Sequence, residues 1–229
     1  MHSIVYNYIE LCKDKAFTGI DDPRVIQGVH LSDSEEAYVC FTFDDGPTSN
    51  YTPQILDILN KHQAKATFFI FGRFATEHPE IIRRIAKEGH ELGNHTYSHP
   101  DLTSLDFAAI EREILEAEQA IQSIVDYRCK LFRPPYGIFS PETVGVVEAL
   151  QYKFALWSRD VQAYDWELPG VDKMAEEVLS HVCNGSIILL HDAGGNREQT
   201  VELVDRVIPI LKSRNYHFIT MSELLAQSV

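Results

Sequence analysis

The sequence is poor in positive charge and in long apolar runs. Its 20 lysine and arginine residues face 34 aspartate and glutamate residues, giving a formal net charge of −14 at pH 7. A chain this acidic is poorly suited to bind nucleic acid or an anionic membrane surface, so we expect neither as a partner. No apolar stretch approaches the roughly 20 residues that a membrane-spanning helix requires. We therefore expect no transmembrane segment.

Cysteine is scarce as well. The four cysteines include no CxxC pair, which argues against a zinc ribbon; they are Cys12, Cys40, Cys129 and Cys183. The first residues also lack the basic segment and apolar core of a secretory signal. As written, the chain is expected in the cytoplasm, although removal of an export segment would leave the same sequence.

Short apolar runs alternate with helical patterns from Ala37 onward, and the 229 residues contain no repeat or low-complexity segment. Strands are predicted at Ala37–Asp44, Ala66–Phe71, Glu91–Asn94, Leu131–Arg133, Phe154–Trp157, Ile187–His191 and His217–Met221. Helices are predicted at Thr52–His62, Glu80–Glu88, Asp106–Val125, Pro141–Gln151, Val171–Val182 and Glu198–Lys212. Thr52 and Ser140 each precede a proline and are predicted to cap the helix that follows.

This alternation, without a long linker, predicts a parallel sheet and an α/β barrel that is closed or nearly closed. An open doubly wound sheet has the same local pattern. Residues 1–36 form a less regular N-terminal extension that ends in an acidic stretch, 32–36, and residues 37–229 form the predicted catalytic domain.

Two adjacent aspartates, Asp44 and Asp45, close an apolar run and are followed at once by Gly46-Pro47, which ends the strand. Two carboxylates at the mouth of a buried strand cannot both stay ionised cheaply, and a bound cation would resolve this. His95 and His99 offer further ligands, and with one carboxylate they would leave an open position, as in catalytic zinc sites. The other aspartate would act as general base. Taken alone, the aspartates also suit a surface turn and the histidines a chance pair.

Further polar residues follow the later strands, where parallel barrels carry their chemistry. Arg133 precedes the stiff Pro134-Pro135 segment and offers a fixed fork for a carboxylate, or for a surface salt bridge. His191 ends an apolar run and is either a satisfied core histidine or a general acid, which Asp165 would orient and whose pKa it would raise. Aromatic faces that suit sugar rings come from Tyr136, Trp157, Tyr164 and Trp166.

Five segments resemble, in order, the motifs of the polysaccharide deacetylase family (NodB homology domain, carbohydrate esterase family 4). They are Thr42-Phe43-Asp44-Asp45-Gly46-Pro47, His95-Thr96-Tyr97-Ser98-His99-Pro100, Arg133-Pro134-Pro135-Tyr136-Gly137, Asp165-Trp166 and Leu189-Leu190-His191. The resemblance covers the chain from Ala37 to Leu225. It implies an α/β fold, a distorted (β/α) barrel of about seven parallel strands.

The resemblance also implies roles for individual residues. A divalent metal, zinc or another ion such as cobalt, would be held by Asp45, His95 and His99. Asp44 would be the general base, positioned by Arg133, and His191 the general acid, tuned by Asp165. Metal-activated water would attack an acetyl carbonyl, and a proton would then pass to the departing amine.

Substrate contacts are implied for three more residues. The backbone amide of Tyr136 would help bind the oxyanion, and Trp166 and Leu189 would line the site for the acetyl methyl group. One segment departs from the family: its fourth motif usually reads Asp-x-x-Asp-Trp, whereas two more residues separate Asp160 from Asp165 here. The departure leaves open which of these two aspartates supports the acid.

The expected function is removal of N-acetyl groups from glycans that contain N-acetylglucosamine, of the chitooligosaccharide or peptidoglycan type. An acetylated glycan is the expected partner, and the family is often exported or associated with the cell wall. The alternatives are an O-acetyl esterase on acetylated polysaccharide, a hydrolase of small cyclic amides, and a carbohydrate-binding pseudoenzyme. The complete set of Asp44, Asp45, His95 and His99 argues against the last. A non-haem iron oxygenase would not explain a second aspartate or a distal histidine.

Overall fold

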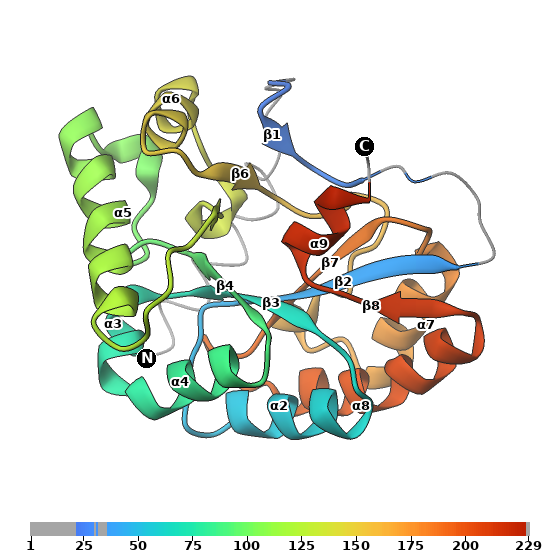
Figure 1. The fold of residues 1–229 in the computed structure, drawn as a ribbon. Coiled ribbons are helices and arrows are strands. Elements are labelled where there is room, and N and C mark those ends of the chain that lie inside the picture. Colours follow the sequence, from blue (N-terminus) through green and yellow to red (C-terminus); the bar gives the residue numbers. More distant parts are fainter. Residues whose placement is uncertain (1–21, 30, 32–35, 228–229) are drawn as a thin grey trace.

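The computed structural model describes residues 22–29, 31 and 36–227. In this part of the chain eight strands form one sheet, in which every pairing is parallel (Figure 1). Seven follow the spatial order β1 (Val25–Ile26), β6 (Lys153–Ala155), β5 (Leu131–Phe132), β4 (Glu91–Asn94), β3 (Ala66–Ile70), β2 (Ala37–Asp44) and β7 (Ser186–His191). The eighth, β8 (Tyr216–Phe218), pairs with the first residues of β2.

The central strands carry the core. Most of β2, together with all of β3 and β7, is buried, as expected for a parallel sheet that is covered on both faces. The rings of Phe43 and Phe68 stack across β2 and β3 with their centroids 5.0 Å apart. β2 and β7 pair in register from Val39 opposite Ser186 to Asp44 opposite His191. This long pairing fixes the two strand ends that carry the candidate site.

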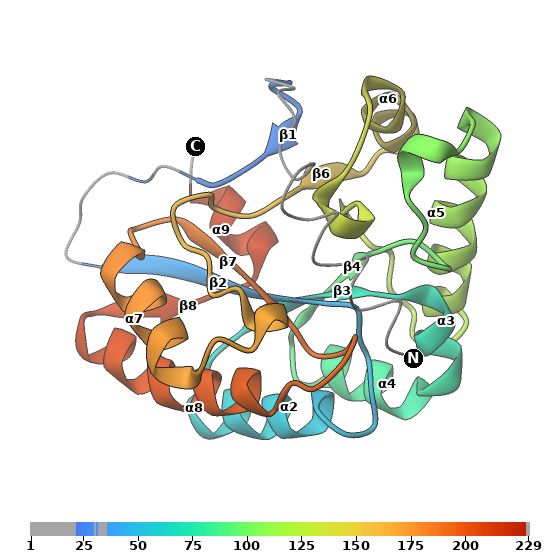
Figure 2. The same cartoon turned by 180° about the vertical axis from the view of Figure 1, so that it is seen from behind.

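All six predicted helices are present. They are α2 (Thr52–Lys61), α4 (Pro79–Lys87), α5 (Phe107–Gln122), α6 (Pro141–Ala149), α7 (Val171–His181) and α8 (Glu198–Ser213). Helices α2, α4 and α8 lie side by side along one face of the central strands in both views (Figures 1 and 2). Short 3-10 turns lie at Leu102–Ser104, Pro135–Gly137 and Asp165–Glu167.

The predicted caps divide into one success and one error. Ser140 caps α6 through a capping box with Thr143, as predicted. Thr52, in contrast, is already the first residue of α2, and its hydroxyl donates to a carboxylate oxygen of Asp192, 2.5 Å away. A tertiary partner therefore replaces the predicted local cap.

Two short helices were not predicted, α3 (Gly72–Glu77) and α9 (Met221–Ala226). The last predicted strand, His217–Met221, is too long at its end. It stops at Phe218, because Thr220 caps α9 through a capping box with Glu223.

The prediction of a distorted barrel is confirmed. β6 does not pair with β7 within the described residues, and irregular chain spans the gap between them. The amide of Ser158 donates to the carbonyl of Ile187, and the hydroxyl of Ser158 accepts from the amide of Ile187. Gln162 forms an isolated parallel bridge with Leu189. The sheet is therefore curled toward closure without a regular final pairing.

The described part of the predicted N-terminal extension contributes β1, which pairs with β6. Arg24 also forms an exposed ion pair with Glu148 of α6 at 2.6 Å. The acidic stretch at 32–35 and Cys12 lie outside the described residues. The division at residue 37 stays a prediction, but a strand of the sheet lies before it.

Of the cysteines in the described part, Cys40 and Cys129 are buried and Cys183 is exposed, and all three are free thiols. Burial of Cys40 inside β2 agrees with its expected role as a small apolar residue. None of the described helices combines the length and apolarity needed to span a bilayer.

Candidate active site

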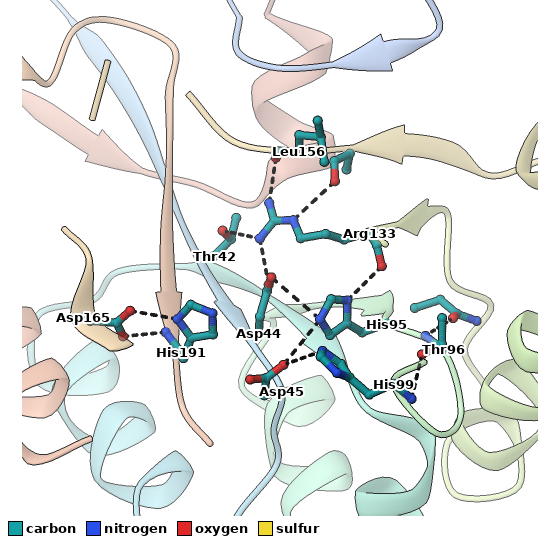
Figure 3. Close-up of polar contacts among 12 residues, drawn as sticks. Thr42, Asp44, Asp45, His95, Thr96, His99, Arg133, Leu156, Asp165 and His191 are labelled. Carbon is teal, nitrogen blue, oxygen red and sulfur yellow. Dashed lines mark hydrogen bonds and ion pairs between the residues drawn. The ribbon is translucent and has the colours of Figure 1, made fainter. Parts of the chain in front are cut away.

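Four strand ends meet at one edge of the sheet and bring the predicted polar residues together (Figure 3). Asp44 ends β2 and His191 ends β7, and the two pair in register. His95 directly follows β4, and Arg133 directly follows β5. All four residues are buried. Because ionisable groups removed from water must find partners within the protein, their mutual contacts determine what the site can do.

Asp45 has a left-handed backbone conformation, with φ of 74°. This conformation costs a non-glycine residue roughly 1–3 kcal/mol. It also interrupts the strand alternation that would send the side chains of Asp44 and Asp45 to opposite faces. Gly194 makes room for the turned side chain, since a Cβ at this position would lie 2.8 Å from Oδ2 of Asp45. Both carboxylates therefore reach the same site.

Asp45, His95 and His99 offer ligand atoms that all lie within 4.8 Å of one another. Oδ1 of Asp45 lies 3.4 Å from Nε2 of His95 and 3.1 Å from Nε2 of His99, close enough for attraction but not aligned as hydrogen bonds. Within the described residues, Oδ1 of Asp45 and Nε2 of His99 are buried without a hydrogen-bond partner. A cation between the three side chains would satisfy both atoms, so this donor set fits a metal ion.

The charge state of Asp45 suits a metal ligand. Burial by itself would raise the pKa of this carboxyl, but the neighbouring His99 and His95 hold it well below its usual range. Asp45 is therefore ionised.

The two histidines sit on a sharply turned loop after β4. Thr96 and His99 both have left-handed backbone conformations, with φ of 66° and 58°. The amide of His99 donates to the hydroxyl of Thr96 at 3.1 Å. Nδ1 of His95 lies 2.8 Å from the carbonyl oxygen of Arg133, and a proton on Nδ1 leaves the lone pair of Nε2 available to a cation held beside Asp45.

Arg133 is wholly buried and holds Asp44. Its Nη1 atom lies 2.7 Å from Oδ1 of Asp44, and further hydrogen bonds run to the hydroxyl of Thr42 and the carbonyls of Ala155 and Leu156. The guanidinium carbon lies 3.9 Å from the ring centroid of Phe69. Oδ2 of Asp44 lies 3.9 Å from Nε2 of His95. The arginine thus engages one carboxylate oxygen, and the other is nearest to the candidate metal ligands.

His191 is paired with Asp165, and Asp160 is exposed, so Asp165 is the aspartate that reaches the histidine. Nδ1 of His191 lies 2.7 Å from Oδ1 of Asp165, while the amide of His191 and the hydroxyl of Thr200 both donate to Oδ2 at 2.8 Å. Burial alone would lower the pKa of His191, but Asp165 raises it above its usual value. Burial would likewise raise the pKa of Asp165, but His191 lowers it.

The three predicted substrate-contact residues border this arrangement. The ring of Tyr136 packs edge-on against that of His99 at 4.6 Å, and its hydroxyl donates to the carbonyl of His99 at 3.4 Å. The ring of Trp166 packs edge-on against His191 at 5.4 Å. Leu189 lies two residues before His191 in β7, on the same face of the strand.

Comparison with known proteins agrees with this geometry. A family model described as polysaccharide deacetylase matches residues 32–155. A peptidoglycan-N-acetylglucosamine deacetylase of Bacillus cereus is 38% identical over 192 residues, which are 84% of this chain and 90% of that protein. The chain belongs to the polysaccharide deacetylase family.

A second relative and a solved structure are also similar to this polysaccharide deacetylase family member over most of its length. A chitooligosaccharide deacetylase of Sinorhizobium fredii is 39% identical over 189 residues, covering 78% of this chain and 87% of that protein. The crystal structure of the Bc1960 peptidoglycan N-acetylglucosamine deacetylase matches with a TM-score of 0.83 at 34% identity, over 88% of this chain and 92% of that chain. The family resemblance found in the sequence is confirmed.

Asp192 supports the site of this polysaccharide deacetylase homologue, although its sequence position at the end of the strand led to no predicted role. Its amide donates to the carbonyl of Asp44 at 3.2 Å, and its carbonyl accepts from the hydroxyl of Thr48 at 3.0 Å. A Cβ at Gly46 would lie 2.2 Å from its carboxylate. Burial raises the pKa of Asp192 to about 7. The residue ties the ends of β2 and β7 together, and its place beside His191 was an available signal.

Arg197 was also missed. It is buried, and its guanidinium donates to the carbonyls of Ala193, Gly194 and Asn196. The arginine thereby folds the segment after β7 back beside Asp45. No local pattern predicts this role, because in the sequence a buried arginine of a polar loop looks the same as an exposed one.

Proposed function

We propose that the protein is a metal-dependent hydrolase that removes N-acetyl groups from glycans containing N-acetylglucosamine. One observation carries the proposal. The cluster of Asp45, His95 and His99 is flanked by two separately held groups, Asp44 fixed by Arg133 and His191 fixed by Asp165 (Figure 3). Hydrolysis of an amide needs one group that accepts a proton from water and another that gives a proton to the leaving nitrogen.

Asp45, His95 and His99 would hold the metal, and we propose zinc, because two histidines and one carboxylate with an open position are typical of catalytic zinc sites. Cobalt or another divalent ion suits the same donors. When bound, the ion supplies Lewis acidity that activates water and polarises the acetyl carbonyl.

Asp44 is the proposed general base. Arg133 fixes its Oδ1, and Oδ2 is nearest to the ligand cluster. As water adds to the carbonyl carbon, Asp44 takes one of its protons. Its contact with Arg133 holds one carboxylate oxygen in place and prevents the carboxylate from turning to become a fourth protein ligand.

His191 is the proposed general acid. Asp165 engages Nδ1, so the proton for the leaving group is carried on Nε2, the opposite ring nitrogen. Asp165 raises the pKa of His191 and so favours the protonated ring that can supply this proton. When the bond between the carbonyl carbon and the nitrogen breaks, the nitrogen takes this proton, and the products are acetate and a free amine.

The substrate class rests on the family. The named relatives act on peptidoglycan and on chitooligosaccharide, both of which carry N-acetylglucosamine. Trp166, edge-on to His191, and Tyr136, edge-on to His99, would contact the sugar on two sides of the reacting acetyl group.

Acetate release tests the proposal. The protein with zinc or cobalt is incubated with N-acetylglucosamine oligomers, peptidoglycan and acetylxylan, and acetate is measured. We expect release from the first two, and loss of it in Asp44→Asn with metal content unchanged. Asp126→Asn is the matched control, because Asp126 is an exposed aspartate outside the candidate site. Release from acetylxylan alone would indicate an O-acetyl esterase. Release from no substrate, with metal bound, would indicate a pseudoenzyme.

A further inference from the structure

The loop that joins the two candidate metal histidines is gripped by a residue that the proposed mechanism does not use. Glu113 lies on α5, and its carboxylate accepts three hydrogen bonds from this loop. Oε2 accepts from the amides of Tyr97 and Ser98 at 3.0 and 2.8 Å, and Oε1 accepts from the hydroxyl of Ser98 at 2.7 Å. Both carboxylate oxygens are therefore directed at the two residues that immediately precede His99.

The opposite side of the loop is held as well. The carbonyls of Thr96 and Tyr97 accept hydrogen bonds from the amides of Gly72 and Arg73, at 2.9 and 3.1 Å. These amides open α3, which packs closely on α5: a Cβ at Gly72 would lie 2.8 Å from Cα of Ala117. The loop is thus clamped between α3, which binds its carbonyls, and Glu113, which binds its amides.

These contacts are needed because two residues of the loop have an unfavourable backbone conformation. Thr96 and His99 both have positive φ, an uncommon state for residues other than glycine. Contacts from outside the loop must therefore stabilise it. A carboxylate is well suited to this, since an ionised acceptor forms shorter and stronger hydrogen bonds to backbone amides than a neutral one.

We propose that Glu113 is a positioning residue for the metal site, whose carboxylate fixes the turn at Tyr97 and Ser98 and so holds His99 in place beside His95 and Asp45. The inference rests on the metal site of the proposed function. It adds a residue on α5 that does not touch the metal, the substrate or the reacting atoms. Partners that orient metal ligands in this way commonly change metal affinity by 10–100-fold when removed.

Metal titration of the whole chain tests this role. The dissociation constant for zinc and for cobalt is measured in the wild type, Glu113→Ala and Glu113→Gln, with His99→Ala as the reference for a lost ligand. Glu116→Ala and Glu116→Gln are the matched controls, because Glu116 is an exposed glutamate on the same helix. We expect Glu113→Ala to weaken binding by about 10–100-fold. Glu113→Gln should lie between it and the wild type, because an amide keeps one acceptor oxygen, and both controls should match the wild type.

Two further measurements separate positioning from a general loss of structure. Amide hydrogen exchange at Tyr97 and Ser98 should accelerate in both Glu113 variants, while exchange in β2 and β7 stays at the wild-type rate. At saturating metal, kcat for acetate release should return to within a few-fold of the wild type. Glu113→Gln keeps this test informative if the alanine variant does not fold.

The proposal is overturned if Glu113→Ala binds metal as the wild type does, or if Glu116→Ala weakens binding equally. It is also overturned if kcat stays low at saturating metal while affinity is unchanged. Metal titration needs no substrate. A wild type that binds metal but releases no acetate therefore contradicts the proposed function and leaves the role of Glu113 intact.

Discussion

Nη1 of Arg133 lies 2.7 Å from Oδ1 of Asp44, although 89 residues separate the two in the chain and both side chains are buried. Three more acceptors surround the guanidinium: the hydroxyl of Thr42 and the carbonyls of Ala155 and Leu156. The arginine therefore compensates a buried carboxylate at the end of β2 and at the same time satisfies two carbonyls at the end of β6.

Arg133→Met should destabilise the metal-free protein by about 3–5 kcal/mol, because the substitution leaves the charge of Asp44 buried without its partner. Urea denaturation in the presence of a chelator measures this. Adding Asp44→Asn to Arg133→Met should recover part of the loss, since the orphaned charge is then removed. Arg128→Met, at an exposed arginine, is the control. A loss no larger than that of Arg128→Met would contradict the structural role of the pair.

The parts of the site that could be predicted from the sequence are those that local pattern determines. Asp44 and Asp45 stand out because they end a buried apolar run before Gly46-Pro47, and His95 and His99 because of their spacing. The rule that parallel barrels carry their chemistry at the carboxyl ends of strands then places Arg133 and His191 beside them. Most strand and helix bounds agree with prediction within a few residues, since apolar runs mark the central strands and an apolar stripe marks the longer helices.

The features that were not predicted depend on contacts between segments that are far apart in the sequence. β1 is two residues long and exists only because it pairs with β6. α3 is too short to display a helical period and is held by the loop after β4. Glu113 looks like any polar residue of an amphipathic helix until the loop of His99 is folded against it. Thr52 fits a local cap, but the approach of Asp192 gives its hydroxyl another partner.

Asp165→Asn should move the alkaline limb of the pH profile of kcat/KM to lower pH. His191 must be protonated to act as an acid, and it is active below its pKa. Asp165 raises that pKa against the opposing effect of burial, so its neutralisation lowers the pH at which the proton is lost. At pH 8 we expect kcat/KM to fall by about 10²–10⁴-fold. Asp160→Asn, at the exposed aspartate of the same segment, is the control. An unshifted limb in Asp165→Asn would remove Asp165 from the proposed role.

Asp192→Asn should change how stability depends on pH. Burial raises the pKa of Asp192 to about 7. The native state therefore retains a proton that the unfolded chain releases near the ordinary aspartate pKa of 3.8. The stability linked to this proton is fully present below about pH 4 and is lost as the pH rises to about 7. Asparagine is neutral throughout and keeps an acceptor for the hydroxyl of Thr52, so the variant should not show this loss.

Thermal unfolding of the metal-free protein between pH 4 and pH 8 measures the difference. The midpoint of Asp192→Asn relative to the wild type should rise with pH by several degrees, corresponding to a change on the order of 1–4 kcal/mol. The metal-free form is used because a bound cation would itself stabilise the carboxylate of Asp192. Asp126→Asn should show a constant offset from the wild type. A constant offset in Asp192→Asn as well would mean that Asp192 is already ionised at low pH.

Tyr164→Ala should weaken the reaction of long glycans and spare that of short ones. Tyr164 is 39% exposed, and its ring packs edge-on against Trp166 at 5.4 Å; Trp166 packs in the same way against His191. The two rings thus form an aromatic strip from the general acid out to solvent, on the segment that is two residues longer than the family motif. A sugar unit next to the reacting one would bury its apolar face against these rings, and a few tens of Å² of apolar surface removed from water stabilise binding by roughly 1 kcal/mol. We expect KM for an N-acetylglucosamine pentamer to rise by about 2–10-fold with kcat unchanged, and the kinetics of the dimer to stay as in the wild type.

Tyr164→Phe keeps the ring and should behave as the wild type, as should Phe107→Ala at an exposed ring on α5. Equal effects of Tyr164→Ala on dimer and pentamer would show that the ring serves only to pack Trp166 against His191.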